Sequence, residues 1–360
     1  MLICLGASPA TGQGKRWRLT DPQRGCRDRA GGSLLDESEG MSLRSWRNFA
    51  VVGIAAALAT SAAAAQSKPS GEPEVAPAAE RALPAPVVQN YQPRPAMWLL
   101  EDADTKIYLL GTIHVLPPGF RWRSPAIERV IADADELVLE TYQQGEDDIP
   151  PGAAQLFALD TPRPILGRVP ADKRTALAEV IADGPLPIEA YAGLRTWAAA
   201  LMIGMGGLLE EYGVDDVDDA PGVEEKLEAD FEAAGKPIGQ IEDPLAVLQS
   251  LNALPEAAQQ ELLLSSIEDE AAGADGEETE DDDAWAQGKA ERLADSLEGL
   301  PPALFDVMVR RRNAAWTDWL ARRLDKPGTV LLAVGAGHLA GTESVQTMLE
   351  ARGLRVKRFD

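Results

Sequence analysis

The chain has two histidines, His114 and His338, and both occupy the last position of a Gly-x-x-His sequence. The first is GTIH at 111–114 and the second is GAGH at 335–338. Each follows an apolar run that predicts a strand, and α/β proteins gather functional groups where strands end. The glycine of each sequence would allow a tight backbone turn as the chain leaves the strand. Two imidazoles brought together in this way suit a divalent transition metal.

A histidine beside an apolar strand can instead be a hydrogen-bonded core residue, and for either histidine alone this interpretation is the stronger one. The matched pattern, in a chain so poor in histidine, favours a shared metal site. The chain lacks a His-Glu-x-x-His sequence, so the common zincin helix is excluded.

Two glutamates have a sequence context that suits a third ligand or a catalytic base. Glu140 ends the apolar run ELVLE at 136–140, and Glu242 ends KPIGQIE at 236–242. An acidic side chain at the end of an otherwise apolar strand needs a partner, because burying an unpaired charge is costly. Either glutamate could simply cap the helix that follows, and for Glu242 this alternative carries equal weight because Pro244 is close behind.

The hydrophobic pattern predicts an α/β fold with a mixed β-sheet, flanking helices and a helical insertion. Residues 97–101 and 106–113 predict a β-hairpin. Further strands are expected at 136–141, 236–241, 329–334 and 354–359. Helices are expected from the cap Ser124-Pro125 onward and near 170–183, 189–207, 221–235, 244–271, 303–325 and 342–352. The helical region therefore spans about 165–325.

Length and charge limit the possible functions. The 360 residues, 45% of them hydrophobic, can bury a sizeable core. With 58 acidic against 34 basic side chains the net charge is −24, which repels phosphate backbones and argues against nucleic acid as a partner. The two cysteines, Cys4 and Cys26, cannot build a disulfide framework or a thiolate zinc site.

The N-terminal part carries a targeting signal. Residues 41–65 combine a basic start, an apolar stretch and the small residues 63–65, which is the layout of a secretory signal peptide. A short membrane anchor is the alternative, although the apolar stretch is short for a membrane span. Residues 1–40 lie in front of this signal, and we interpret them as an over-called extension with translation starting at Met41.

The segment 66–96 is rich in Pro, Ala and Glu and predicts an extended linker, with order beginning at Met97. Cleavage after the signal would leave a periplasmic or secreted protein with no stable membrane span.

An acidic run at 268–283 holds ten carboxylates in sixteen positions. Such a run repels itself and predicts a solvated loop or a frayed helix end. Its spacing does not match an EF-hand loop, so a calcium site is disfavoured.

Five segments, taken in order, resemble the TraB/GumN family, which is related to the animal Tiki proteins. They are GTIH, ELVLE, GVEEKLEADFEAAGKPIGQIE at 222–242, RRN at 311–313 and VGAGHLAGTESVQTMLEARGLRV at 334–356. The likeness covers residues 97–360, which would form one Tiki/TraB-like domain.

The resemblance implies that His114 and His338 bind a divalent metal, with Mn or Co favoured and Zn possible, and that Glu140 stands beside them as a third ligand. Arg312 and Asn313 match the family's Arg-Asn step on a long C-terminal helix. The family includes metalloproteases, proteins that shut down a peptide pheromone, and proteins from exopolysaccharide gene sets. Fold and site therefore transfer from it better than substrate does.

We accordingly expect an exported metal-dependent hydrolase, peptidase-like, that acts on a peptide or envelope polymer. Glu140 or Glu242 would act as ligand or general base, Arg312 would steady the developing oxyanion, and Asn313 would belong to the same catalytic group. The alternative is a non-catalytic envelope protein that binds a peptide or polysaccharide-related ligand in the same cleft.

Overall fold

The computed structural model describes residues 87–142, 152–184, 186–214, 219–272, 277–298 and 300–359. The predicted extension 1–40, the predicted signal peptide 41–65 and most of the predicted linker 66–96 lie outside these residues.

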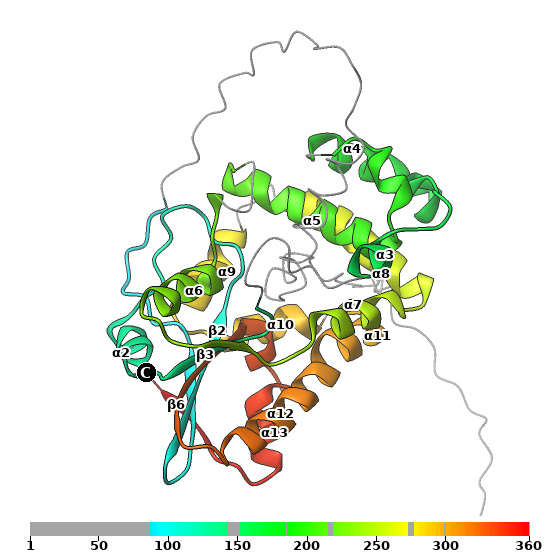
Figure 1. Cartoon of the computed structure of the whole chain (residues 1–360). Helices are drawn as coiled ribbons and strands as arrows, with labels where there is room; N and C mark the ends of the chain where they lie inside the picture. The colour runs from blue at the N-terminus through cyan, green and yellow to red at the C-terminus, as the bar shows by residue number, and fades with distance from the viewer. Residues whose placement is uncertain are drawn as a thin grey trace, which may run out of the picture. The chain divides into compact units, whose positions relative to one another are not determined.

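A six-stranded mixed sheet organises the domain, as the sequence pattern predicted (Figure 1). Its strands are β1 (Met97–Glu101), β2 (Thr105–Thr112), β3 (Glu136–Leu139), β4 (Ile238–Gln240), β5 (Gly328–Gly335) and β6 (Val356–Phe359). In the order β4-β3-β5-β2-β1-β6, the first four strands run parallel to one another. The predicted hairpin is confirmed, because β1 pairs antiparallel with β2, and β6 pairs antiparallel with β1.

The helices of the described residues follow the strands and fill the connections between them. The α-helices are α2 (Pro125–Asp133), α3 (Ala153–Phe157), α4 (Arg174–Asp183), α5 (Thr196–Tyr212), α6 (Val223–Ala233), α7 (Pro244–Asn252), α8 (Glu256–Ala272), α9 (Glu277–Ala286), α10 (Ala290–Glu298), α11 (Pro302–Phe305), α12 (Arg311–Arg323) and α13 (Val345–Ala351). Short 3-10 helices are η2 (Ile165–Arg168), η3 (Ala171–Lys173), η4 (Ala190–Gly193) and η8 (Ala336–Leu339), and η7 (Asp306–Arg310) is a π-helix.

Alternate residues of the central strands face two separate cores. Leu110 of β2 packs in a core that includes Leu227 of α6 and residues of α2. Its neighbour Leu109 faces the other side, in a core with Trp316 of α12 and residues of α13. Because β2 and β5 are buried on both faces, both read as continuous apolar runs.

The predicted helical region has a third core of its own. Its buried side chains come from α3 to α5, from α7, α8 and α10, and from the α11–η7 segment, with Trp197 and Leu262 among those fully enclosed. However, α6 and β4 also lie within 165–325 and belong with the sheet. The helical region is therefore interrupted rather than a single insertion.

The acidic run differs in part from the predicted solvated loop or frayed helix end. Its described residues lie in helices, 268–272 at the end of α8 and 277–283 in α9, while 273–276 lie outside the described residues. Two of its carboxylates accept hydrogen bonds from tyrosines, Asp282 from Tyr212 at 2.9 Å and Asp283 from Tyr91. The helix is anchored further by Trp285, which is buried. Fixed partners and a buried aromatic ring outweigh the repulsion on which the prediction rested.

The predicted helix 303–325 is interrupted by a π turn. In η7 the amide N–H of Arg311 donates to the carbonyl of Asp306, five residues earlier instead of four. Turns of this kind are frequent at functional sites, and this one ends at Arg310, two residues before Arg312.

The predicted boundary at Met97 is late, because the chain is already packed before it. Pro93 and Pro95 are buried, and the amide N–H of Arg94 donates to the carbonyl of Ala286 at 2.6 Å. The last part of the predicted linker is therefore fixed against α9. Within the described ranges, no helix has both the length and the apolar character that a membrane crossing requires.

Candidate active site

The four candidate residues on strand ends come together at one edge of the sheet. His114 follows β2, His338 follows β5 in η8, Glu140 directly follows β3, and Glu242 follows β4. These are the four adjacent parallel strands, and their carboxyl ends meet at the same edge. These four residues, which are far apart in the chain, are therefore close together in space.

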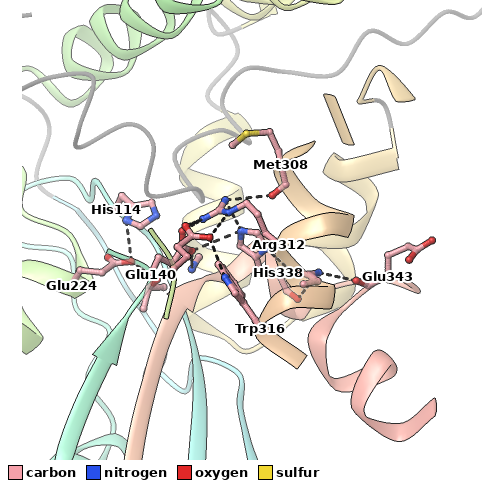
Figure 2. A network of polar contacts seen from close by, with 12 residues as sticks. His114, Glu140, Glu224, Met308, Arg312, Trp316, His338 and Glu343 are labelled. Atoms are coloured by element: carbon pink, nitrogen blue, oxygen red, sulfur yellow. Dashed lines mark hydrogen bonds and ion pairs between the residues drawn. The ribbon is translucent and has the colours of Figure 1, made fainter. Parts of the chain in front are cut away.

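Arg312 lies in the middle of this group (Figure 2). Its guanidinium pairs with Glu140, and it binds Glu242 through two nitrogens, Nη2 to Oε1 at 2.5 Å and Nε to Oε2 at 2.9 Å. Its Nη1 lies 3.0 Å from Nε2 of His338 and 3.3 Å from the carbonyl oxygen of Met308, in the π turn. Arg312, Glu140 and His338 are buried and Glu242 is nearly so, and the single positive charge of Arg312 is shared by the two carboxylates.

The contacts of His338 determine its tautomer. A guanidinium only donates hydrogen bonds, so Nε2 of His338 must accept the bond from Arg312. The ring proton is then on Nδ1, which lies 2.6 Å from Oδ1 of Asn313. Burial lowers the pKa of His338 well below its ordinary value, and the nearby charge of Arg312 lowers it further. His338 is therefore a neutral acceptor at neutral pH.

Asn313 and Trp316 fix the surroundings of this imidazole. The amide of Asn313 donates to the carbonyl oxygens of His338 and Glu343, at 3.3 and 2.7 Å. The ring of Trp316 lies 4.2 Å from that of His338 between centroids, and its indole N–H donates to Glu242 at 3.0 Å. Asn313, predicted as catalytic, thus holds His338 in place from one side.

His114 has a different environment. Its Nδ1 lies 2.9 Å from Oε1 of Glu224, which also accepts a hydrogen bond from the hydroxyl of Thr112. Its Nε2 is buried and has no hydrogen-bond partner among the described residues. A carboxylate on Nδ1 with Nε2 left open is the arrangement that holds catalytic and metal-binding histidines in proteins.

Opposing effects determine the charge of His114. Burial by itself would lower its pKa, but the charge and hydrogen bond of Glu224, with a smaller contribution from Glu140, raise the pKa to about 9. Burial likewise acts to raise the pKa of Glu224, and His114 and Thr112 bring it below its ordinary value. Burial raises the pKa of Glu242 although Arg312 opposes this.

Glu224 is the site residue that the sequence reasoning missed. It lies in the first turn of α6, and the start of α6 packs directly on the motif, with the amide of Val223 donating to Ile113 at 3.0 Å. A Cβ at Gly222 would overlap the carbonyl oxygen of His114, so only glycine allows this approach. The signal was present in GVEEKL at 222–227, where a glycine precedes a helix that begins with two glutamates.

The motif glycine Gly111 has a different role from the predicted one. It lies inside β2 and needs no unusual backbone conformation. A Cβ there would lie 3.1 Å from both the Cα and the Cβ of Ala336. Its carbonyl also accepts a hydrogen bond from Trp285 at 2.9 Å. Gly111 therefore lets the two Gly-x-x-His segments pack closely, and the expectation of a tight turn is wrong for it.

The predicted metal ligands fit a metal only in part. His114 offers an open Nε2, but Arg312 occupies Nε2 of His338 and one oxygen of Glu140, whose other oxygen accepts from the amide of Gly335 at 2.6 Å. Across the described parts of the chain, no three or more His, Cys, Asp or Glu side chains are arranged to hold a metal ion. The guanidinium of Arg312 therefore occupies the position next to His338 and Glu140 that a metal bound by these two residues would take.

The fold and site together define a mixed α/β protein with a buried histidine, carboxylate and guanidinium centre at its parallel-strand edge. Residues 96–358 match the TraB/PrgY/gumN family, and the chain belongs to that family. Comparisons with curated proteins and with solved structures found no match.

Proposed function

We propose that the chain is a hydrolase that cleaves amide bonds in peptides, with its active site at the edge formed by β2, β5 and β3. The observation that carries the proposal is the buried, open Nε2 of His114, held from behind by Glu224 and adjoining the Arg312 cluster. A buried polar atom without a partner is costly, and such atoms are retained mainly where a ligand or substrate completes them.

In this proposal each side chain has a defined task. His114 presents Nε2 to the substrate side while Glu224 fixes its orientation and stabilises the positive ring in the metal-free protein, and a metal bound at Nε2 would have to displace that proton. The five N–H donors of Arg312 are all engaged in this structure, so stabilisation of a developing oxyanion by its guanidinium would require the release of one of these bonds. Glu140 and Glu242 hold that guanidinium, and Asn313 holds His338.

We also propose a divalent metal as cofactor, with manganese or cobalt favoured. His114, His338 and Glu140 would hold it, the last two after Arg312 has withdrawn. When bound, such an ion polarises the scissile carbonyl and lowers the pKa of water. A location outside the cytoplasm is part of the same proposal, and the signal-like sequence 41–65 supports it.

A non-catalytic binding protein is the second candidate, and one observation favours it. Arg312 is already paired with two carboxylates and with His338, so the centre is complete without a metal apart from His114. Such a protein would bind a peptide or an envelope polymer at the same edge of the sheet without cleaving it.

A digest of a peptide library, combined with elemental analysis of the protein, tests the proposal. Wild type should carry a transition metal and cleave peptides, and His114→Ala should lose the cleavage. Lys357→Gln is the matched control, because Lys357 pairs with Glu101 on the surface away from the site. Metal-free protein that binds peptides without cleaving them would favour the second candidate.

A further inference from the structure

The segment that leads into β1, residues 87–96, forms no helix or strand and is nevertheless fixed on the domain. The amide N–H of Arg94 donates to the carbonyl of Ala286 in α9 at 2.6 Å. Gly288 lies so close to the segment that an added Cβ would be 2.6 Å from the carbonyl oxygen of Arg94. The family match starts at residue 96, so nearly all of this segment lies outside the part of the chain that the family defines.

We propose that this segment, the N-terminal strap, belongs to the support of the active site, and that Gln89 and Tyr91 in it are positioning residues for His114. The inference rests on the proposed hydrolase activity at His114. It adds what holds the strand before that residue and the loop after it.

A continuous chain of hydrogen bonds runs through the strap from the loop after His114 to α9. The amide N–H of Arg121 donates to Oε1 of Gln89 at 2.7 Å, and Nε2 of Gln89 donates back to the carbonyl of Arg121 at 2.9 Å. The same Nε2 donates to the hydroxyl of Tyr91 at 2.9 Å, and that hydroxyl donates to Asp283 of α9. Two side chains of the strap therefore join the loop to the helix.

The contacts of α9 lead back to β2. Trp285 donates its indole N–H to the carbonyl of Gly111 at 2.9 Å, and its ring lies 6.4 Å from that of Phe120 in the loop, between centroids. The segment 111–121, which contains His114, is thus held at both ends by one connected set of contacts. Because a small displacement of a reacting group lowers the rate steeply, these contacts bear on the proposed activity.

The strap and Glu224 hold His114 in different ways. Glu224 lies 2.9 Å from Nδ1 and fixes the imidazole ring, whereas the strap acts on the backbone that carries the ring. Loss of the strap's hydrogen bonds should therefore shift the imidazole while its bond to Glu224 stays. Displacement of a reacting group affects the transition state more than the binding of substrate, so kcat should change and KM should not.

Steady-state kinetics and histidine NMR of a double variant test the inference. Gln89→Ala combined with Tyr91→Phe removes both side-chain links and keeps the aromatic ring. With the peptide that wild type cleaves fastest in the library digest, we expect kcat to fall by about tenfold at unchanged KM. In chelator-treated protein at one fixed pH, the imidazole signals of His114 should shift, and those of His338 should not.

Thr196→Val is the matched control, because it also removes a hydroxyl that donates to a carboxylate, that of Glu256 at 2.9 Å, far from the strap in the chain. Its kcat and its His114 signals should equal those of wild type. If the double variant fails to fold, Tyr91→Phe alone decides by the same two measurements, with shifts in the same direction.

Unshifted His114 signals in the folded variant would overturn the inference, and cleavage at the wild-type rate would then leave the proposed hydrolase standing. An equal fall of kcat in Thr196→Val would overturn the inference too, because the loss would then follow stability and not position. If wild type cleaves no peptide, the proposed function fails by itself. The NMR signals then decide the inference: a shift confined to His114 supports it, and no shift overturns it.

Discussion

Replacing Glu224 with glutamine should lower the raised pKa of His114. Glu224→Gln keeps the size of the side chain and removes the negative charge that lies 2.9 Å from Nδ1 of His114. Without that charge, burial dominates, and His114 should become neutral at neutral pH.

The magnitude follows from the pKa of His114, which the folded protein raises from 6.5 to about 9. A shift of this size corresponds to about 3 kcal/mol of folding free energy. Because the folded pKa is the higher one, this contribution is complete below pH 6.5 and is lost as the pH rises through 9. Glu224 has a lowered pKa, so its contribution is complete above its unfolded value of 4.5 and is lost as the pH falls from there through the folded pKa. The two contributions overlap between about pH 5 and 6.5, where the variant should lose most.

Denaturant unfolding of chelator-treated protein at pH 6, 7.5 and 9.5, followed by tryptophan fluorescence, measures this difference. Because the chain has two histidines, NMR can follow the titration of His114 directly. Glu225→Gln is the comparison variant, since Glu225 is the next residue on α6, makes no hydrogen bond to His114 among those described, and raises the pKa of His114 less than Glu224 does, so its effect should have the same direction and be smaller. The reasoning is refuted if the stability difference between wild type and Glu224→Gln is the same at pH 6 and pH 9.5, or if His114 still titrates near 9 in the variant.

Three further substitutions test how the site is held. Gly222→Ala should destabilise the protein by about 3 kcal/mol and lower the pKa of His114, because the added Cβ overlaps the His114 carbonyl oxygen. Denaturant unfolding measures the stability and histidine NMR measures the pKa. A stable variant with an unchanged His114 pKa would contradict this prediction. Asn313→Ala should cost about 1–3 kcal/mol in urea unfolding, because Nδ1 of His338 loses its buried acceptor, and a loss below about 0.5 kcal/mol would count against the assigned tautomer. Trp285→Phe keeps an aromatic ring but removes the indole N–H that donates to Gly111 and part of the buried side chain, so urea unfolding should show a loss of at least about 1 kcal/mol. No measurable loss would mean that α9 does not stabilise the motif strand through this bond.

Much of the sheet could be predicted from the sequence because each of these strands has a recognisable local pattern of apolar residues. β5 is an unbroken apolar run, and β1 and β2 flank a short turn of acidic residues, so length and pattern suffice. The convergence of His114, His338, Glu140 and Glu242 followed from one rule, that parallel strands end at the same edge.

The partners within the site could not be predicted in the same way. Glu224 reaches His114 because α6 begins against the motif backbone, a contact between residues far apart in the chain. Likewise, Arg312 was expected to face a substrate, and the structure pairs it with both glutamates and with His338. In the acidic run, the charges alone predicted a solvated loop or a frayed helix end, whereas Asp282 and Asp283 lie in α9 and accept hydrogen bonds from Tyr212 and Tyr91, which are far away in the chain.

Because of the π turn of η7, the continuous helical segment from α11 to α12 packs in two different hydrophobic cores. Leu304 and Met308, before and within the turn, pack in the helical core, whereas Trp316 and Leu320 of α12 pack beneath the sheet. An α-helix turns by about 100° per residue, so the extra residue of a π turn rotates everything before it against everything after it. Deleting one residue from 306–310 would restore regular helical geometry and put the two halves out of phase. Leu304 would turn away from its core while Arg312 stayed in the site. The deletion variant, with its regular α-helix, would therefore be less stable than the wild-type protein.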